Sequence, residues 1–201
     1  MADVNWGRLS RALNHWTDLG YKQVDVPWRV KRMYIKSTME DVEPAMIKHL
    51  DMFEGGKDSR CLIGSGEQAF IEMLWNRKLV GGNYVTCTPC FRDDLVDDLH
   101  QREFMKVEVI STTWPTLDNL FDLVEKARRF FLSEIGLPLH ESGLRVVETS
   151  VEHPSFDIDL NGIEIGSYGI REWLGMKWIY GTGVAEPRFT KALKQAPFLP
   201  S

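Results

Sequence analysis

A cation, a histidine and an aromatic ring follow one another over a short stretch of the chain. Arg92 closes an apolar run, His100 lies in the polar span after it, and Phe104 opens an alternating run. This order fits a hairpin that grips a nucleotide, because an arginine fork binds phosphate through paired charge-assisted hydrogen bonds. An aromatic ring adds base stacking worth roughly 1–3 kcal/mol. A charged hairpin tip with a buried Phe104 fits equally well, so these residues alone leave both interpretations open.

A second candidate phosphate site lies further along the sequence, where Gly181 and Gly183 precede Arg188. Glycine lets a backbone pass close to a ligand because it has no Cβ. Arg188 is expected at the start of a helix, where free N–H groups also attract a terminal phosphate. Pro187 fits the first turn of that helix, since the N–H that proline lacks would be unpaired there. A glycine pair by itself is weak evidence for a nucleotide site.

A helix followed by a strand is expected near the N-terminus. Residues 21–27 are predicted to be extended and closed by Pro27. Gly20, just before them, is expected to end the helix. The apolar residues that recur at helical spacing ahead of this glycine are Leu9, Ala12, Leu13, Trp16 and Leu19.

Taken together, the three segments resemble the three motifs of the class II aminoacyl-tRNA synthetases, in the order in which that family carries them. Residues 9–27 resemble motif 1, the family's dimer element. The stretch from Phe91-Arg92 to Glu103-Phe104 resembles motif 2 with the short loop of the aspartyl branch, and the run from His100-Gln101 through Lys106-Val107-Glu108 is similar to the seryl branch. Residues 181–188 resemble motif 3. Asp94 stands where the family usually has a glutamate.

The resemblance implies an ATP site. It assigns Arg92 to the α-phosphate and Arg188 with His100 to the γ end, and the two arginines would be the catalytic residues. Phe104 would stack on the adenine. The other members of the implied ATP-binding set are Asp94, Gly181 and Gly183.

Two carboxylates flank a predicted hairpin turn at Asn161-Gly162, a strong short hairpin signal. In the resemblance to the aspartyl branch, Asp157 and Glu164 take the positions that approach the magnesium ions of ATP, with Asp159 as an alternative to Asp157. Magnesium takes oxygen ligands and keeps several waters, so one or two carboxylates plus triphosphate oxygens are enough. The implied cofactors are therefore ATP and Mg²⁺.

The same resemblance implies an amino-acid site made of Ser65, Glu67, Lys106 and Arg171. Glu67 would hold the α-amino group, although an acidic residue in a first helical turn is also favoured by the helix dipole. In the aspartyl branch, and in the related ammonia-dependent asparagine synthetase, an arginine at the position of Arg171 meets a side-chain carboxylate, which implies an acidic amino acid. Phe70 stands where that branch has a lysine, so the class of side chain stays open.

The composition of the chain limits the class of protein and the partners that these interpretations allow. The 201 residues are 43% hydrophobic and 26% charged, which is ordinary for a globular protein. No apolar run approaches the roughly 20 residues of a membrane span, and no signal peptide is evident, so a cytoplasmic protein without a membrane partner is expected. Cys87 and Cys90 have CxxC spacing but no partner pair, so they are interpreted as small strand residues rather than zinc ligands. The net charge of −5 gives no argument for nucleic acid.

The expected architecture is one α+β domain over residues 1–201, an antiparallel sheet flanked by helices in the class II synthetase-like manner. The helices are expected at 39–53, from Ser65 to about Arg77, from Trp114-Pro115-Thr116 to near Gly136, and from Glu186 to about Gln195. The strands are expected at 61–64, 83–91, 103–113, 144–150, 155–161, 163–168 and 177–182. The chain stops soon after Arg188, so an anticodon-reading domain is not expected.

The function expected from these features is ATP-dependent activation of an amino acid to an aminoacyl-adenylate by a homodimer. The acceptor would not be chosen by an anticodon, and it could be a tRNA acceptor end, a carrier protein, another macromolecule or ammonia. Two alternatives stay open. One is a non-catalytic synthetase paralogue that binds an amino acid or regulates a partner, and the other is an amide ligase similar to asparagine synthetase.

Overall fold

The computed structural model describes residues 4–38, 60–92 and 95–195. Its helices are α1 (Trp6–Asp18), α2 (Arg32–Ile35), α4 (Gly66–Trp75), α5 (Leu117–Ile135), α6 (Leu139–Ser142) and α7 (Arg188–Gln195). Its strands are β1 (Lys22–Gln23), β2 (Arg29–Lys31), β3 (Arg60–Leu62), β4 (Asn83–Phe91), β5 (Glu103–Ser111), β6 (Leu144–Ser150), β7 (Ser155–Leu160), β8 (Ile163–Trp173) and β9 (Met176–Glu186).

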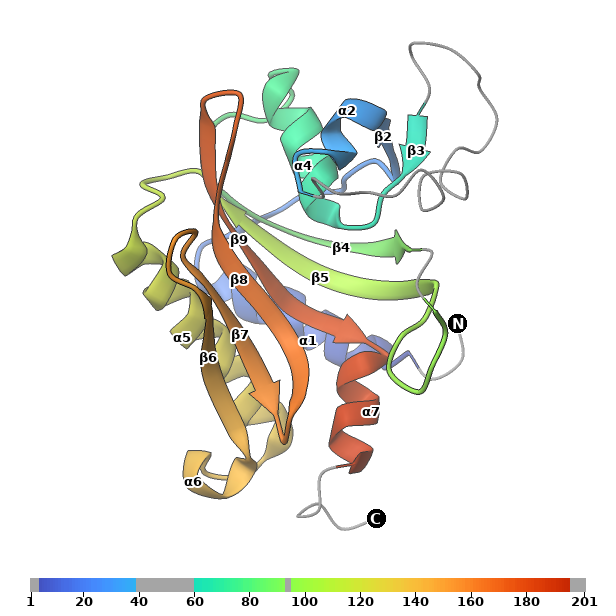
Figure 1. Cartoon of the computed structure of the whole chain (residues 1–201), viewed down its shortest axis with the longest axis vertical. Helices are drawn as coiled ribbons and strands as arrows, with labels where there is room; N and C mark the ends of the chain where they lie inside the picture. The colour runs from blue at the N-terminus through green and yellow to red at the C-terminus, as the bar shows by residue number, and fades with distance from the viewer. Residues whose placement is uncertain (1–3, 39–59, 93–94, 196–201) are drawn as a thin grey trace.

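Seven of the strands form one sheet in the order β1-β4-β5-β9-β8-β7-β6 (Figure 1). Its neighbours pair antiparallel, apart from the parallel pair β1 and β4. β2 and β3 pair with each other in a separate small sheet. This is the α+β arrangement with a mostly antiparallel sheet that the sequence predicts.

Apolar cores lie on both faces of the large sheet. Val109 and Ile110 are adjacent in β5, and successive side chains of a strand point to opposite faces. Val109 packs with α1, α5 and α7, whereas Ile110 packs with α2, α4 and the small sheet. Strand β5, in the interior of the sheet, is therefore covered on both sides. This packing fixes the strand and the residues next to its two ends.

The helix boundaries follow local capping chemistry. Ser65 and Thr116 accept hydrogen bonds from the first turns of α4 and α5, and Asn5 does the same for α1. Gly136 ends α5 in the left-handed conformation at φ +74°. These ends lie where the sequence predicts them. Across the described ranges, no helix has the length and apolar character needed to cross a membrane.

Strands β8 and β9 run well beyond the predicted ends at residues 168 and 182. Glycine weakens a strand interior, but two of the glycines here lie opposite a tyrosine: Tyr168 pairs with Gly181, and Gly169 with Tyr180. The tyrosine rings cover the glycines so closely that a Cβ on Gly169 would lie 2.8 Å from the Tyr180 ring. Cross-strand aromatic rings of this kind stabilise strand glycines.

Other predicted elements differ in smaller ways. The strand expected at 21–27 is limited to β1, and β2, α2 and α6 were not predicted. The last helix begins at Arg188 rather than Glu186, because Glu186 still belongs to β9. The helix expected at 39–53 lies outside the described residues.

A buried ionic cluster joins α1 to the end of β9. The Arg8 guanidinium donates to Glu186, whose side chain is fully buried, and to the Thr190 hydroxyl at 2.7 Å. Its Nε also pairs with Glu134 of α5 at 3.1 Å. Arg8 thus connects three elements at the point where β9 gives way to α7 and Arg188.

We expect Arg8→Met to lower the free energy of unfolding by about 3–5 kcal/mol, because it leaves the Glu186 carboxylate buried without its cation. Arg11→Met is the matched control on the same helix, since the Arg11 side chain is 56% exposed and should cost less than about 1 kcal/mol. Urea denaturation followed by circular dichroism measures both. Equal losses in the two variants would contradict the structural role given to Arg8.

Candidate functional site

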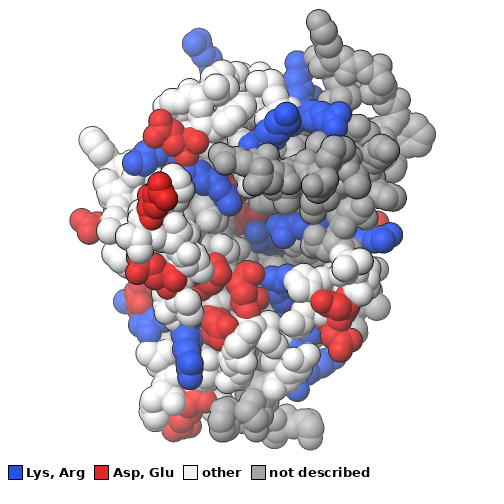
Figure 2. Space-filling view, in the orientation of Figure 1, with Lys and Arg blue, Asp and Glu red and all other residues white. Residues whose placement is uncertain are grey.

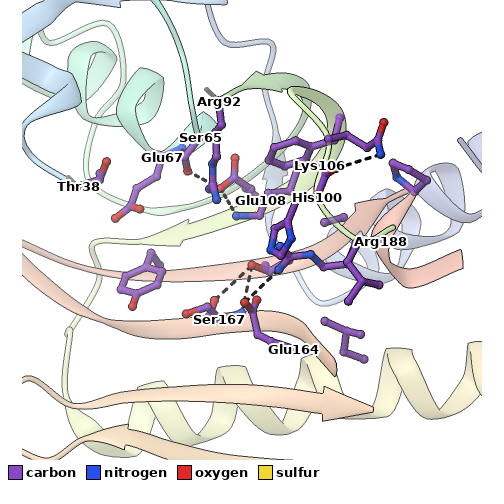
Figure 3. Close-up of a pocket in the computed structure, with 18 of the residues that line it drawn as sticks. Thr38, Ser65, Glu67, Arg92, His100, Lys106, Glu108, Glu164, Ser167 and Arg188 are labelled. Atoms are coloured by element: carbon purple, nitrogen blue, oxygen red, sulfur yellow. Dashed lines mark hydrogen bonds and ion pairs between the residues drawn. The ribbon is translucent and has the colours of Figure 1, made fainter. Parts of the chain in front are cut away.

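A cavity of about 330 Å³ opens beside the sheet, between the N-terminus of α4, the β4–β5 hairpin, strands β8 and β9, and the start of α7 (Figure 3). Basic and acidic side chains are interspersed over this face of the molecule (Figure 2). The structure brings most of the predicted site residues to this one cavity. They are Ser65, Glu67, Arg92, His100, Phe104, Lys106, Glu164, Arg171 and Arg188.

Arg92 and Phe104 form one wall of the cavity. Arg92 directly follows β4, and its Nε donates to the Gly64 carbonyl at 3.0 Å. Its guanidinium lies 5.3 Å from the centroid of the Phe104 ring. Phe104 is held by its pairing with Cys90 across the β4–β5 hairpin. The arrangement offers guanidinium N–H groups to an anion beside an aromatic ring, which is the chemistry that the sequence predicts for a nucleotide.

Asp97 organises the loop that carries His100. Its carboxylate lies 2.8 Å from His100 Nδ1 and accepts hydrogen bonds from the backbone N–H groups of Leu99 and His100. Hydrogen bonds from the His100 ring and from these two N–H groups lower the pKa of Asp97 to about 2. Sequence reasoning missed Asp97, although an aspartate in a polar loop is a turn signal, because its side chain can accept from the backbone N–H two residues on. Asp94, predicted to bind ATP, lies outside the described residues.

Glu108 is a central site residue that the sequence analysis did not single out. Its carboxylate accepts hydrogen bonds from the Ser65 hydroxyl at 2.5 Å and from the Gly66 N–H, and it pairs with Lys106 at 2.8 Å. Burial alone would raise the pKa of Glu108, but Lys106 and these donors outweigh it, so the pKa lies below its ordinary value. The alternation of Phe104, Lys106 and Glu108 on one face of β5 is the signal that could have found it.

Glu67 and Arg171 are joined at the far end of the cavity. Arg171 donates to Glu67 Oε2 at 2.5 Å, and the Trp178 indole donates to Oε1 at 2.6 Å. The Arg171 guanidinium also lies 3.9 Å from the centroid of Tyr180. Both oxygens of Glu67, which was predicted to hold an α-amino group, therefore already have a protein donor.

Glu164 and Arg188 form an ion pair at the end of the cavity near the start of α7, 3.1 Å apart (Figure 3). Asp157 lies opposite Ser167 in the β7–β8 pairing and does not line the cavity. Burial raises the pKa of Asp157, and the nearby Glu164 and Asp159 carboxylates add to this, although a hydrogen bond with Ser167 opposes it. No cluster of three or more potential metal ligands occurs among the described residues. A cation at this position would therefore be bound by two carboxylates and by oxygen atoms of a bound substrate.

Gly181 and Gly183 were predicted to border ATP. The position that a Cβ would take on each of them faces the core rather than the cavity. A Cβ on Gly181 would approach Leu123 and Tyr168, and one on Gly183 would approach Val107 and Trp16. Close packing of β9 against α1 and α5 is thus the reason that the structure gives for these glycines. Their contact with ATP stays a prediction.

Cys87 and Cys90 agree with their interpretation as strand residues. Both lie in β4 as free thiols, and Cys90 is buried. Burial raises the pKa of Cys87 to about 11 and raises that of Cys90 as well, and the Glu108 carboxylate adds to both shifts. Thiols held in the protonated form are poor metal ligands and nucleophiles.

The fold is that of a class II aminoacyl-tRNA synthetase catalytic domain. No protein-family model matches the sequence, and no curated protein sequence matches it. The chain resembles two structures of pyrrolysyl-tRNA synthetase from Desulfitobacterium hafniense at 15% identity, with TM-scores of 0.69 and 0.70. These matches cover 92% and 97% of this chain, and 66% and 73% of the synthetase chains.

A third similar structure is the cytoplasmic serine–tRNA ligase of Naegleria fowleri in complex with AMP. Its TM-score is 0.70 at 15% identity, and the match covers 96% of this chain and 48% of the ligase. The resemblance inferred from the three sequence segments is confirmed as a likeness of fold.

We expect Glu108→Gln to lower the free energy of unfolding at pH 7 by about 1.5–3 kcal/mol, since hydrogen bonds to a charged group are lost and Lys106 loses its partner. The pKa of Glu108 is depressed in the folded state, so its contribution is complete above its ordinary pKa of 4.5 and is lost as the pH falls through the lower folded value. The gap between wild type and variant should therefore narrow on acidification.

Urea denaturation at pH 7 and at pH 3.5 checks this expectation. Glu103→Gln, at the exposed start of the same strand, is the matched control and should change stability by less than about 0.5 kcal/mol at either pH. A gap that stays constant with pH would mean that Glu108 does not carry the charge assigned to it.

Proposed function

We propose that this protein activates an amino acid with ATP, forming an aminoacyl-adenylate and releasing pyrophosphate. One observation carries the proposal: Arg92 and Arg188, from segments distant in the sequence, line a single cavity together with Glu164 and the Glu67–Arg171 pair. The class II synthetase fold supports it, because the neighbouring structures are named as tRNA synthetases or ligases. Residues 1–201 would act as a single catalytic domain.

The proposed reaction is an attack by the amino-acid carboxylate on the α-phosphorus of ATP. Arg92 would bind the α-phosphate and meet the charge that develops there, while Phe104 stacks on the adenine. Arg188 and His100 would bind the γ end. The protein's contribution is then positioning and charge neutralisation, which lowers the barrier without covalent chemistry by a side chain.

Glu164 and Asp157 are proposed to hold Mg²⁺. Two carboxylates fit this ion, since magnesium is bound through one or two carboxylates together with substrate phosphates. Burial, and to a smaller extent the neighbouring carboxylates, raises the pKa of Asp157. When bound, the ion would neutralise phosphate charge, and the role of Glu164 would be to orient it after releasing Arg188.

Ser65, Glu67, Lys106 and Arg171 are proposed to surround the amino acid, because all four line the same cavity. The neighbours' names point to a tRNA as acceptor, and we propose that its acceptor end receives the activated amino acid. We also propose a cytoplasmic location, as stated for the serine–tRNA ligase.

Arg92→Ala should lower the rate of amino-acid-dependent exchange of pyrophosphate into ATP by about 10²–10³, the usual cost of one donor to a developing charge. Exchange is measured with each of the twenty amino acids, and circular dichroism checks the fold. Arg129→Ala, which removes an arginine side chain that is 73% exposed on α5, is the matched control and should exchange at the wild-type rate. Full exchange by Arg92→Ala with a true substrate would contradict the proposal.

A homodimer is also proposed, although on different residues from those that the sequence indicates. Trp16, in the segment that resembles the family's dimer element, is fully buried within one chain and so cannot form the interface. Instead, α1 and its C-terminal cap expose Trp6 and Leu19, at 59% and 40%, and the segment before β2 exposes Trp28, at 58%. Exposed aromatic residues of this kind are typical of interfaces.

Light scattering at micromolar concentration should therefore give the mass of two chains. Trp28→Glu should shift the protein toward monomer, because a charge would be buried in the interface. Trp114→Glu, at a more exposed tryptophan in the segment between β5 and α5, is the control and should leave the dimer intact. A wild-type monomer would count against the proposal.

A further inference from the structure

The pair of Glu67 and Arg171 closes one end of the cavity. Arg171 donates to one oxygen of Glu67 at 2.5 Å, and the Trp178 indole donates to the other at 2.6 Å. The Glu67 side chain is 6% exposed and that of Arg171 is 33% exposed. The pair is thus mostly buried but keeps an edge toward the cavity that both residues line.

Rigid elements hold this pair in place. Arg171 of β8 lies directly opposite Trp178 of β9, and Trp178 is fully buried. Glu67 lies in the first turn of α4, whose start is capped by Ser65. The guanidinium is stacked on Tyr180, 3.9 Å from its centroid. A substrate entering this end meets a preformed arrangement of donors and acceptors.

The charge of Arg171 is already balanced. Burial would lower its pKa, but the Glu67 carboxylate outweighs this and keeps the guanidinium charged. The neighbouring Glu108 is balanced in turn by Lys106. A substrate carboxylate placed against Arg171 would lie beside the Glu67 carboxylate, and two like charges at such a distance oppose each other's ionisation.

The Glu67–Arg171 pair can still both donate and accept hydrogen bonds. A guanidinium has five N–H donors, and a carboxylate has about four acceptor positions. Among the described residues, Glu67 takes one of those donors, and Arg171 and Trp178 take two of those acceptor positions. What remains next to the cavity is a donor beside an acceptor, with no net charge.

We propose that the amino acid bound at this end carries a carboxamide side chain, as asparagine and glutamine do. A carboxamide places a carbonyl acceptor and an N–H₂ donor on one carbon, so its oxygen meets Arg171 while its nitrogen donates to Glu67. The inference rests on the proposed function for the placement of the amino acid. It departs from the acidic amino acid that the family resemblance implied, because Glu67 already neutralises the arginine on which that expectation depended.

The first experiment compares asparagine, glutamine, aspartate, glutamate and serine. Pyrophosphate exchange gives kcat/KM for each, and calorimetric titration in the presence of a non-hydrolysable ATP analogue gives binding. We expect asparagine or glutamine to exceed its own acid by at least about 100-fold in both, since a site with buried groups left unpaired rejects the wrong ligand strongly. Whichever of asparagine and glutamine is preferred shows whether the site fits the shorter or the longer side chain.

The second experiment changes Glu67→Gln. Without the carboxylate, Arg171 keeps an unbalanced charge, so the preference for carboxamide over carboxylate should fall at least tenfold, or about 1.4 kcal/mol. Glu72→Gln is the matched control. Glu72 lies on the same helix, is equally buried and pairs with Arg60 at 2.8 Å, but it does not line the cavity. It should leave the preference unchanged.

The outcomes separate this inference from the proposed function. Exchange with aspartate or glutamate in preference to the amides would support activation and overturn the carboxamide. Carboxamide binding without exchange would support the inference and overturn activation. A preference for serine would overturn the carboxamide, and binding of none of the five amino acids would overturn it together with the placement of the substrate. The wild-type titrations decide these cases even if Glu67→Gln does not fold.

Discussion

The buried carboxylate of Glu108 is the interaction on which the cavity depends. It lies on central strand β5, and it binds the Ser65 hydroxyl and the Gly66 N–H at the start of α4. The N-terminus of a helix favours a negative charge, so the carboxylate both fixes α4 against the sheet and gains from its dipole. That tie, together with the apolar packing of α4 and the donors from Arg171 and Trp178, fixes Glu67 relative to Arg171 on β8.

Acidic and basic residues around the cavity come from different elements and meet in pairs. Glu67 of α4 pairs with Arg171 of β8, Glu108 with Lys106 on β5, and Glu164 of β8 with Arg188 of α7. The two pairs near α4 are mostly buried, whereas the Glu164 side chain is 46% exposed. An exposed ion pair is weak. Under the proposed function, a polyphosphate would therefore take Arg188 from Glu164 at little cost, while the inner pairs would persist and keep their geometry.

Local signals in the sequence predicted most of the elements. The turn at Asn161-Gly162 adopts the expected positive φ angles of 52° and 90°, and the strand at 144–150 has the predicted bounds. The strands β8 and β9 were underestimated because their glycines are stabilised by tyrosines on the neighbouring strand, which sequence patterns do not reveal. The burial of Trp16 against Gly183 likewise depends on a contact between segments far apart in the sequence.

The candidate site, too, could be predicted from the sequence only in part. Residue types and spacing predicted nine of the side chains that line the cavity. They could not show which of the charged side chains neutralise each other. Glu67 and Arg171 are 104 residues apart, and their pairing depends on α4 being held beside β8. Glu108 and Asp97 act through other residues, by positioning Ser65 and His100, so their importance became visible in the folded chain.

The strand order has a consequence for how the molecule assembles. Strand β9 lies between β5 and β8, so residues 176–186 join two parts of the sheet that are complete earlier in the chain, β1-β4-β5 on one side and β8-β7-β6 on the other. Such long-range pairing forms slowly, because a large loop must close first. Arg92 and Phe104 belong to the first part and Glu164 to the second. A nascent chain therefore has no ligand pocket until its last strand is in place, and ligand binding would report that completion directly.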